Sequence, residues 1–243
     1  MIADSQSKNV QRDEQSAMRG IFVTFEGGEG SGKTTQLTLL ANRIRGSGKE
    51  VIGTHDPGGT AIGKEIRTLL LDPGSAPIAA ATELLLYEAS RAQLVRELIA
   101  PALRRGVVVL CDRFTDSTLA YQGFGRNLDL DLIQRLNRCA TDGLVPDLTI
   151  LLDLDPEIGL TRCRRVVSVD ASTQLSAEPL CWDRIEAEPL DFHQRIREGY
   201  RTLARENPDR MIVIDAGLGV TEIEAVVWNQ FLRLQDRCDD AVS

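Results

Sequence analysis

The stretch IFVTFEGGEGSGKTT, residues 21–35, joins an apolar segment to a glycine-rich loop. Residues 21–25 are all β-branched or aromatic, which is typical of a buried strand. The loop matches G-x-x-x-x-G-K-[ST] at every fixed position from Gly27 to Thr34. Residues 33–45 then carry apolar side chains at helical spacing. This order predicts a phosphate-binding loop between a strand and a helix.

The loop has the composition that triphosphate binding requires. Its glycines allow the backbone to curl, so that successive N–H groups point at phosphate oxygens. The helix opening near Lys33 adds unpaired N–H groups and a positive dipole end. We expect Lys33 to reach the β- and γ-phosphates, and the Thr34 hydroxyl to bind Mg²⁺. The expected ATP contacts are Gly27, Gly28, Glu29, Gly30, Ser31, Gly32, Lys33, Thr34 and Thr35.

Glu29 is an unexpected residue in this loop, because a carboxylate inside an anion cradle costs electrostatic energy. Two interpretations are open. The carboxylate faces a second ligand, such as a sugar hydroxyl or a metal-bound water, or it lies on a solvated loop tip.

The rest of the chain alternates strand-like and helix-like segments. Further strands are predicted from residue 51 and at 107–111, 148–154 and 211–214, and helices at 82–103, 129–140, from 156 and at 220–236. Such alternation indicates crossover units around a parallel sheet. We therefore expect an α/β fold of three layers, the P-loop NTPase fold, with about five parallel strands and helices on both faces.

One segment interrupts this pattern. Residues 166–179 are rich in Ser, Thr and Ala, have no persistent period and lie between arginines. We predict a mobile flap here, within a lid at about 162–185 of a single domain spanning 19–238. Residues 1–18 are polar and are expected to form a disordered tail.

Composition limits the classes of partner. The chain has 243 residues and a net charge of −8, which disfavours binding to a nucleic-acid backbone. No apolar run approaches the roughly 20 residues that cross a bilayer. The five cysteines include no C-x-x-C pair, and the two histidines do not complete a zinc set. We expect a cytoplasmic protein without nucleic-acid or membrane partners.

A second polar motif, DRFTDSTLAYQG at residues 112–123, directly follows the apolar segment 107–111. Open α/β sheets place ligands at this end of a parallel strand. The motif occurs together with DPGGT at 56–60, with Tyr87-x-x-x-Arg91-Ala92-Gln93, and with DRIE at 183–186. With these four segments the chain resembles the thymidylate kinases, from about residue 20 to its C-terminal helix.

The resemblance implies an ATP- and Mg²⁺-dependent enzyme that converts dTMP to dTDP on the route to dTTP, and it implies a homodimer. It implies that Arg113 holds the acceptor phosphate, a task that suits a bidentate guanidinium. Asp112 would orient Mg²⁺ or its waters. Tyr87, where the family commonly has Phe, would stack on thymine, and Arg91 would hydrogen-bond the base edge.

The resemblance also implies the remaining acceptor contacts: Glu29, Asp56, Pro57, Thr118, Tyr121 and Gln122. Thr118 and Gln122 would be aimed at the base, and Tyr121 would lie beneath the sugar and disfavour a 2′-hydroxyl. Ordinary packing is the alternative for Tyr87, Arg91, Thr118 and Tyr121. The family often has Arg-Glu where this chain has His55-Asp56, and the stretch between Arg165 and Asp183 is longer than its usual lid.

Phosphoryl transfer depends on positioning and charge neutralisation more than on covalent chemistry. The dTMP phosphate, with a second pKa of about 6, is largely dianionic and needs no general base. Lys33, Mg²⁺ and Arg113 supply part of the positive charge. We predict that a lid arginine completes it, chosen from Arg162, Arg164, Arg165 and Arg184.

Two other functions stay open. Another nucleoside monophosphate kinase would share the triphosphate site but not the base pocket. A P-loop switch without catalysis would not need a second pocket, and the chain lacks the N-K-x-D segment of guanine-nucleotide switches.

Overall fold

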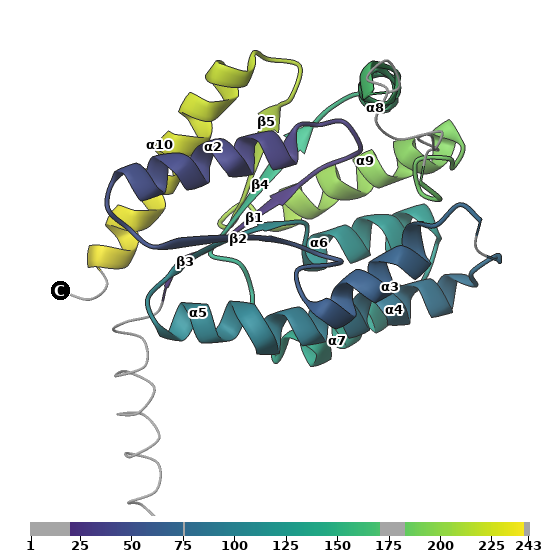
Figure 1. Cartoon of the computed structure of the whole chain (residues 1–243), viewed down its shortest axis with the longest axis horizontal. Helices are drawn as coiled ribbons and strands as arrows, with labels where there is room; N and C mark the ends of the chain where they lie inside the picture. Colours follow the sequence, from purple (N-terminus) through teal and green to yellow (C-terminus); the bar gives the residue numbers. More distant parts are fainter. Residues whose placement is uncertain (1–19, 75, 171–182, 241–243) are drawn as a thin grey trace, which may run out of the picture.

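The computed structural model describes residues 20–74, 76–170 and 183–240. Within these residues five parallel strands form one sheet in the order β2-β3-β1-β4-β5 (Figure 1). The strands are β1 (Phe22–Glu26), β2 (Val51–His55), β3 (Val108–Asp112), β4 (Leu148–Asp153) and β5 (Met211–Asp215). The predicted parallel sheet of about five strands is confirmed. Because β1 lies between β3 and β4, the loop after it sits at the middle of the sheet's carboxyl edge.

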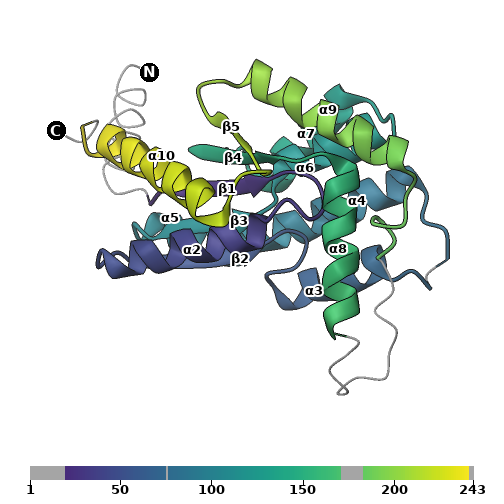
Figure 2. The ribbon, with the colours of Figure 1, turned by 90° about the horizontal axis from the view of Figure 1, so that it is seen from above.

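Helices cover both faces of the sheet, as Figures 1 and 2 show. α2 (Lys33–Gly46) and α10 (Val220–Asp240) cover one face, where Leu40, Ile44 and Phe231 are buried against the strands. The other face is covered by the continuous run of α4 (Ala80–Leu94), the π-helical η1 (Val95–Ile99) and α5 (Ala100–Arg104), and by α9 (Leu190–Glu206). The long helix predicted at 82–103 therefore contains a π-helical turn.

Several helices were not assigned from the sequence. They are α3 (Ala61–Leu71), α6 (Thr115–Thr118), the π-helical η2 (Leu119–Gly125) and α9. α3 carries apolar side chains at helical spacing, Ile62, Ile66, Leu69 and Leu70, although it buries little besides Gly63 and Leu70. α9 also carried a signal, because its buried Phe192, Ile196 and Tyr200 recur every fourth residue. The assigned helices include α7 (Leu130–Thr141) and α8 (Pro156–Asp170).

The predicted flap begins within a helix. α8 continues to Asp170, so residues 166–170 of the flap are helical, and its mobility stays a prediction. A helix that has formed its first turn gains a hydrogen bond for each residue added, which favours extension into a weakly patterned stretch. The rest of the flap, residues 171–179, and the predicted tail, residues 1–18, lie outside the described residues.

Candidate active site

The glycine loop packs tightly against the neighbouring strand and helix. Gly27 and Gly30 have positive φ angles of 137° and 64°. A Cβ atom would lie 2.4 Å from the Leu152 carbonyl oxygen at Gly27, and 2.2 Å from the Gly159 carbonyl oxygen at Gly30. Only glycine satisfies both the backbone angle and this close approach. The loop therefore presents a surface of backbone groups.

Lys33, the first residue of α2, lies over the loop. Its Nζ donates to the carbonyl oxygen of Gly28 at 2.8 Å and to that of Gly27 at 3.1 Å. Burial, together with the charge of Arg113, lowers the pKa of this ammonium group. The lysine and the unpaired N–H groups of the first turn of α2 make this end of the helix a site for anions.

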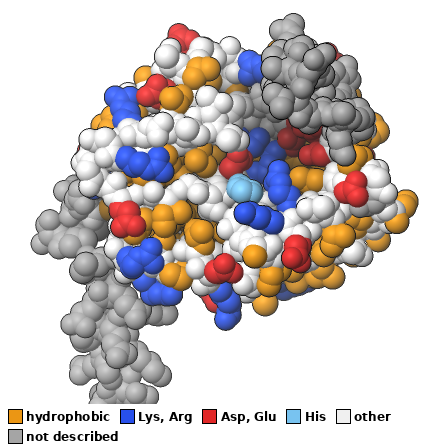
Figure 3. All heavy atoms as spheres, viewed as in Figure 1, with side chains coloured by type: hydrophobic (Ala, Val, Ile, Leu, Met, Phe, Trp, Pro, Cys, Tyr) orange, Lys and Arg blue, Asp and Glu red, His pale blue; other side chains and the backbone are white. Residues whose placement is uncertain are grey.

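A cleft of about 730 Å³ opens above the loop. Figure 3 shows it as a hollow in which Lys and Arg side chains gather. It is lined by residues 29–35 of the loop and α2, by residues 53–56 at the end of β2, and by Arg67, Asp112, Arg113, Arg162, Cys163 and Glu186. The volume and the cationic lining suit a nucleoside triphosphate.

The two predicted metal ligands meet in this cleft. The Thr34 hydroxyl donates to Oδ2 of Asp112 at 2.6 Å, although the residues are 78 positions apart. Asp112 ends β3 and Thr34 begins the helix after β1, and these two strands are neighbours in the sheet. A hydroxyl and a carboxylate are both oxygen ligands of the kind that Mg²⁺ prefers.

Arg113 joins the loop to the second motif. The residue has a positive φ of 70°, a conformation uncommon outside glycine. Its Nη1 donates to the Gly27 carbonyl oxygen at 3.0 Å, and its guanidinium lies 4.8 Å from the centroid of the Tyr121 ring. The start of the second motif therefore lies against the glycine loop.

Glu29 is not a solvated loop tip. Its Oε1 pairs with Nη2 of Arg113 at 2.8 Å and accepts from the Tyr121 hydroxyl at 2.6 Å. Burial alone would raise the pKa of Glu29, but the charges of Arg113 and Lys33 outweigh it and lower the pKa to about 2. The acidic residue inside the anion cradle is thus compensated by the arginine that the second motif supplies. A direct ligand for Glu29 stays a prediction.

A second cavity adjoins the first at Glu29, Asp56, Arg67 and Arg113, which line both. At about 80 Å³ it is too small for a whole nucleotide, so the sugar and phosphate of an acceptor would extend into the larger cleft. Besides Glu29, Asp56 and Arg113, its lining includes all the other predicted acceptor residues: Pro57, Tyr87, Arg91, Thr118, Tyr121 and Gln122.

Arg91 is deeply buried beside this second cavity, with 1% of its surface exposed. Its guanidinium has five N–H hydrogens. It donates to five acceptors: Asp56, Glu88, Asn137, the Phe114 carbonyl oxygen and Thr118. Contact between Arg91 and a base therefore stays a prediction that requires exchange of a bond, the longest being 3.3 Å to Phe114. Asp56 is only 3% exposed, and its carboxylate pairs with Arg91 instead of facing solvent.

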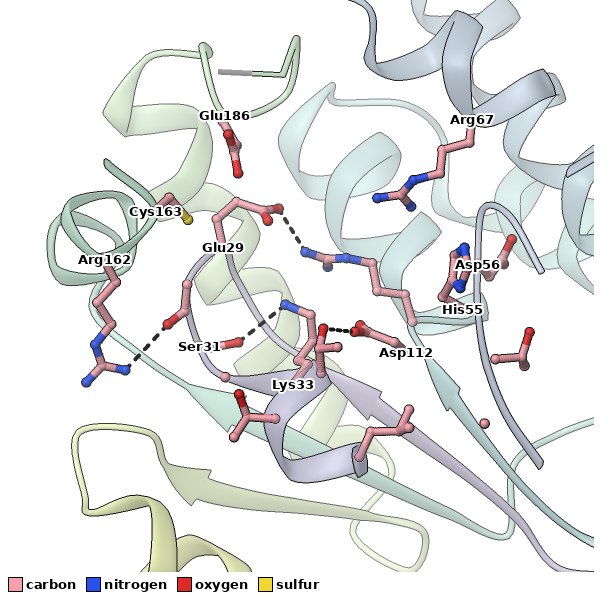
Figure 4. Close-up of a pocket in the computed structure, with 18 residues that line it drawn as sticks. Glu29, Ser31, Lys33, His55, Asp56, Arg67, Asp112, Arg162, Cys163 and Glu186 are labelled. Atoms are coloured by element: carbon pink, nitrogen blue, oxygen red, sulfur yellow. Dashed lines mark hydrogen bonds and ion pairs between the residues drawn. The ribbon is translucent and has the colours of Figure 1, made fainter. Parts of the chain in front are cut away.

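Arg67 on α3 was missed by the sequence analysis. It lines both cavities and donates from Nη1 to the Pro57 carbonyl oxygen at 3.0 Å. Arg67 and Arg162 approach the cleft from opposite sides in Figure 4. A Thr60 side chain that accepts from the Gly63 N–H marks the start of α3, so the helix could have been found. The direction of its arginine could not.

The predicted lid arginines do not all lie at the cleft. Arg162 is exposed and lines the cleft, and its Nη1 donates to the Ala216 carbonyl oxygen at 3.2 Å. Arg184 instead pairs with Glu83 and donates from Nε to the Leu70 carbonyl oxygen at 2.8 Å, so it is not among the residues that line the triphosphate cleft. The side chains of Arg164 and Arg165 lie outside the described part of the chain.

A buried carboxylate supports Arg113 from below. Glu26, at the end of β1, accepts from the Phe114 N–H at 2.8 Å, from the Ser117 hydroxyl at 2.6 Å and from the Tyr200 hydroxyl at 2.7 Å. Burial and the nearby charge of Asp116 raise the pKa of Glu26 to about 7. Nη1 of Arg113 lies within 3.4 Å of both hydroxyl oxygens. Glu26 therefore links β1, the second motif and α9.

Comparison of the chain with family models, known sequences and solved structures identifies its relatives. The family model described as thymidylate kinase matches residues 25–227. The chain is 53% identical over 213 residues to the thymidylate kinase of Geobacter sulfurreducens, covering 88% of this chain and 97% of that protein. It is 50% identical over 208 residues to that of Solidesulfovibrio magneticus, covering 86% and 97%. The crystal structure of thymidylate kinase from Ehrlichia chaffeensis is similar, with a TM-score of 0.66, 32% identity, and coverage of 88% of this chain and 99% of that one.

Proposed function

We infer the roles of individual residues from one premise: the chain belongs to the thymidylate kinase family, and it phosphorylates dTMP to dTDP with ATP. The observation that supports the assignment of roles is the junction of the two cavities. Arg113 and Glu29 line both, beside the lysine of the glycine loop. A phosphate donor in the larger cleft and an acceptor in the smaller one would therefore meet at these residues.

The donor site would be formed by residues 27–35. Backbone N–H groups of the loop and of the first turn of α2 would bind the phosphate oxygens of ATP. Lys33 would exchange its bonds to the loop carbonyl oxygens for bonds to the β- and γ-phosphates. Its buried ammonium group carries the compact charge that this position needs.

Mg²⁺ would be held by Thr34 and Asp112, together with phosphate oxygens. Within the described residues no three His, Cys, Asp or Glu side chains cluster as a metal site. The pair fits Mg²⁺, which usually takes one or two protein ligands and fills its shell with phosphates and water. The ion would neutralise charge on the donor phosphates.

On the acceptor side, Arg113 would hold the phosphate of dTMP, and Arg67 is placed to join it. Tyr121, whose hydroxyl is bonded to Glu29, would lie beneath the sugar. Asp56 and Pro57 would line one side of the cavity. The base would be surrounded by Tyr87, Arg91, Thr118 and Gln122.

The reaction itself moves one phosphoryl group between oxygens. A phosphate oxygen of dTMP attacks the γ-phosphorus of ATP, the bond from that phosphorus to the β–γ bridging oxygen breaks, and ADP leaves with the electron pair. The nucleophile is already anionic, so no residue needs to remove a proton. What the protein supplies is alignment and positive charge, from Lys33 and Arg113 in particular.

We propose that residues 19–238 act as one kinase domain and that the lid, at about 162–185, adds a cation when it closes. Arg162 is the strongest candidate, because it already lines the triphosphate cleft. Arg164 and Arg165 follow it on the same helix, and Arg184 would have to leave Glu83. Closure would also exclude water, which otherwise hydrolyses ATP.

The test is ADP release with ATP and Mg²⁺ and each of dTMP, dUMP, UMP, CMP, AMP and GMP. Marked preference for dTMP is expected, because the acceptor contacts surround both the base and the sugar. Activity confined to a different monophosphate would reassign the acceptor site to another nucleoside monophosphate kinase. ATP binding without release of ADP for any of them would favour a switch. K33M, which lacks the loop ammonium group, is the inactive control.

A homodimer and a cytoplasmic location complete the proposal. Exposed apolar side chains on three helices that pack together, α3, α4 and α7, offer a surface for a second copy: Ile62, Leu69, Leu85 and Leu132. L85E should yield a monomer in light scattering, whereas V226E on α10 should not. No disulfide joins the cysteines of the described ranges, in line with a reducing compartment. No helix in the described ranges has the length and apolar character to cross a membrane.

A further inference from the structure

Glu83 on α4 is a buried carboxylate to which the reaction assigns no role. Its side chain is 1% exposed, and three side chains converge on it. Nε2 of Gln122 donates to Oε1 at 2.8 Å. Arg126 donates to both oxygens at 3.2 Å, and Arg184 pairs with Oε2.

The two arginines fix the charge of Glu83. Burial alone would raise the pKa of this carboxyl, but hydrogen bonds from Arg126 and Gln122, with the charges of both arginines, outweigh it and lower the pKa. Glu83 is therefore ionised at neutral pH. An ionised carboxylate accepts hydrogen bonds and donates none.

This charge decides how the Gln122 amide is oriented. The amide has a donating nitrogen and an accepting oxygen, and only the nitrogen can face an acceptor-only carboxylate. The amide oxygen is therefore turned away from Glu83. It accepts no hydrogen bond from the described residues, and Gln122 lines the acceptor cavity beside Tyr87 and Thr118.

We propose that Glu83 is a specificity-determining positioning residue, which holds the Gln122 amide so that its oxygen accepts the N3–H of thymine. The inference rests on the proposed function, in which Gln122 faces the base. Thymine carries a hydrogen on N3, whereas cytosine has a lone pair there. A fixed oxygen at this point attracts the first and repels the second, and Glu83 sets this choice without touching the base.

The substitution E83Q reverses the arrangement. The new amide must turn its oxygen to the position of Oε2, where Arg184 and Nη2 of Arg126 both donate, because guanidinium groups only donate. Its nitrogen then takes the place of Oε1, loses the bond from Nε of Arg126 and faces Gln122, which can accept only through its own oxygen. The Gln122 nitrogen would consequently face the base, where it suits cytosine better than thymine.

The measurement is the dissociation constant of dTMP and of dCMP by titration calorimetry. We expect E83Q to lower the preference for dTMP over dCMP by about 10- to 100-fold, the effect of one mismatched hydrogen bond. Q122A should lower it by a similar factor, and adding E83Q to Q122A should change it no further. R126M is the matched control, because it loosens the same cluster but leaves an acceptor-only carboxylate, so the preference should persist.

The inference is overturned if E83Q weakens both ligands equally, or if its effect on the preference is undiminished in the Q122A background. If Q122A alone leaves the preference unchanged, the base contact of the proposed function fails instead. Should E83Q not fold, a neutron structure of the native chain with dTMP decides: deuterium atoms of the Gln122 amide directed at Glu83 support the proposal, and both directed at the base refute it.

Discussion

Replacing Glu26 with glutamine tests how much a charge buried beneath the glycine loop changes the free energy of unfolding. The side chain is 0% exposed and forms no ion pair within the described residues, only hydrogen bonds to Phe114, Ser117 and Tyr200. Glutamine has the same shape. It keeps an oxygen for the Phe114 N–H, and its nitrogen can donate to the two hydroxyl oxygens.

The magnitude follows from the pKa of Glu26, which burial and Asp116 raise from 4.5 to about 7. The unfolded chain releases this proton near pH 4.5 and the folded protein near pH 7, so between these values the folded state binds more protons. Stability from the protonated group is therefore full below pH 4.5 and is lost as pH rises to about 7. The total loss is about 3 kcal/mol at 1.36 kcal/mol per pKa unit, and most of it falls between pH 5 and pH 8.

Glutamine does not titrate, so E26Q escapes this loss. Urea unfolding of both proteins at pH 5, 6, 7 and 8 gives the difference in unfolding free energy, from which the titration of other groups cancels. The difference should move in favour of E26Q by roughly 2–3 kcal/mol over this range. E65Q, on the exposed side of α3, is the control for the chemical change. A difference that stays constant with pH, or that moves in favour of the native chain, refutes the reasoning.

Three further predictions concern catalysis. R113M should lower kcat/KM for dTMP on the order of 100-fold or more, because it removes a charge-assisted contact to the acceptor phosphate, while the KM for ATP changes little. D112N should raise the Mg²⁺ concentration needed for half-maximal activity by about tenfold or more, measured by Mg²⁺ titration at fixed ATP; an unchanged requirement would exclude the aspartate as a ligand. Each lid arginine is replaced in turn by alanine: Arg162, Arg164, Arg165 and Arg184. At least one replacement should lower kcat by orders of magnitude, and four variants with near-native kcat would contradict the prediction.

The local sequence was sufficient to predict the parts of the site that are formed by one short segment. Residues 21–35 contain the strand, the glycines and the lysine of the phosphate loop in consecutive order. The sequence analysis named Thr34 and Asp112 separately as Mg²⁺ ligands. Their contact at 2.6 Å depends on the sheet order, because β1 lies beside β3 and the carboxyl ends of adjacent parallel strands meet at one edge of a sheet.

Other features depend on which side chains the packing of helices brings together. All N–H donors of Arg91 form hydrogen bonds because α4, α6 and α7 surround its guanidinium. The spacing of residues in the sequence does not indicate these contacts. The Arg126 and Arg184 contacts to Glu83 join segments 43 and 101 residues apart. Arg67 lines the cleft because of how α3 is rotated against α4.

The sequence by itself therefore determined the phosphate loop, the parallel sheet and the class of reaction, since each depends on residues close together in the chain or on the ends of neighbouring strands. Only the tertiary structure decided the charge states and partners of Glu26, Glu29 and Glu83. The free energy of a carboxylate depends on its burial and on the cations beside it, and both are set by residues distant in the sequence.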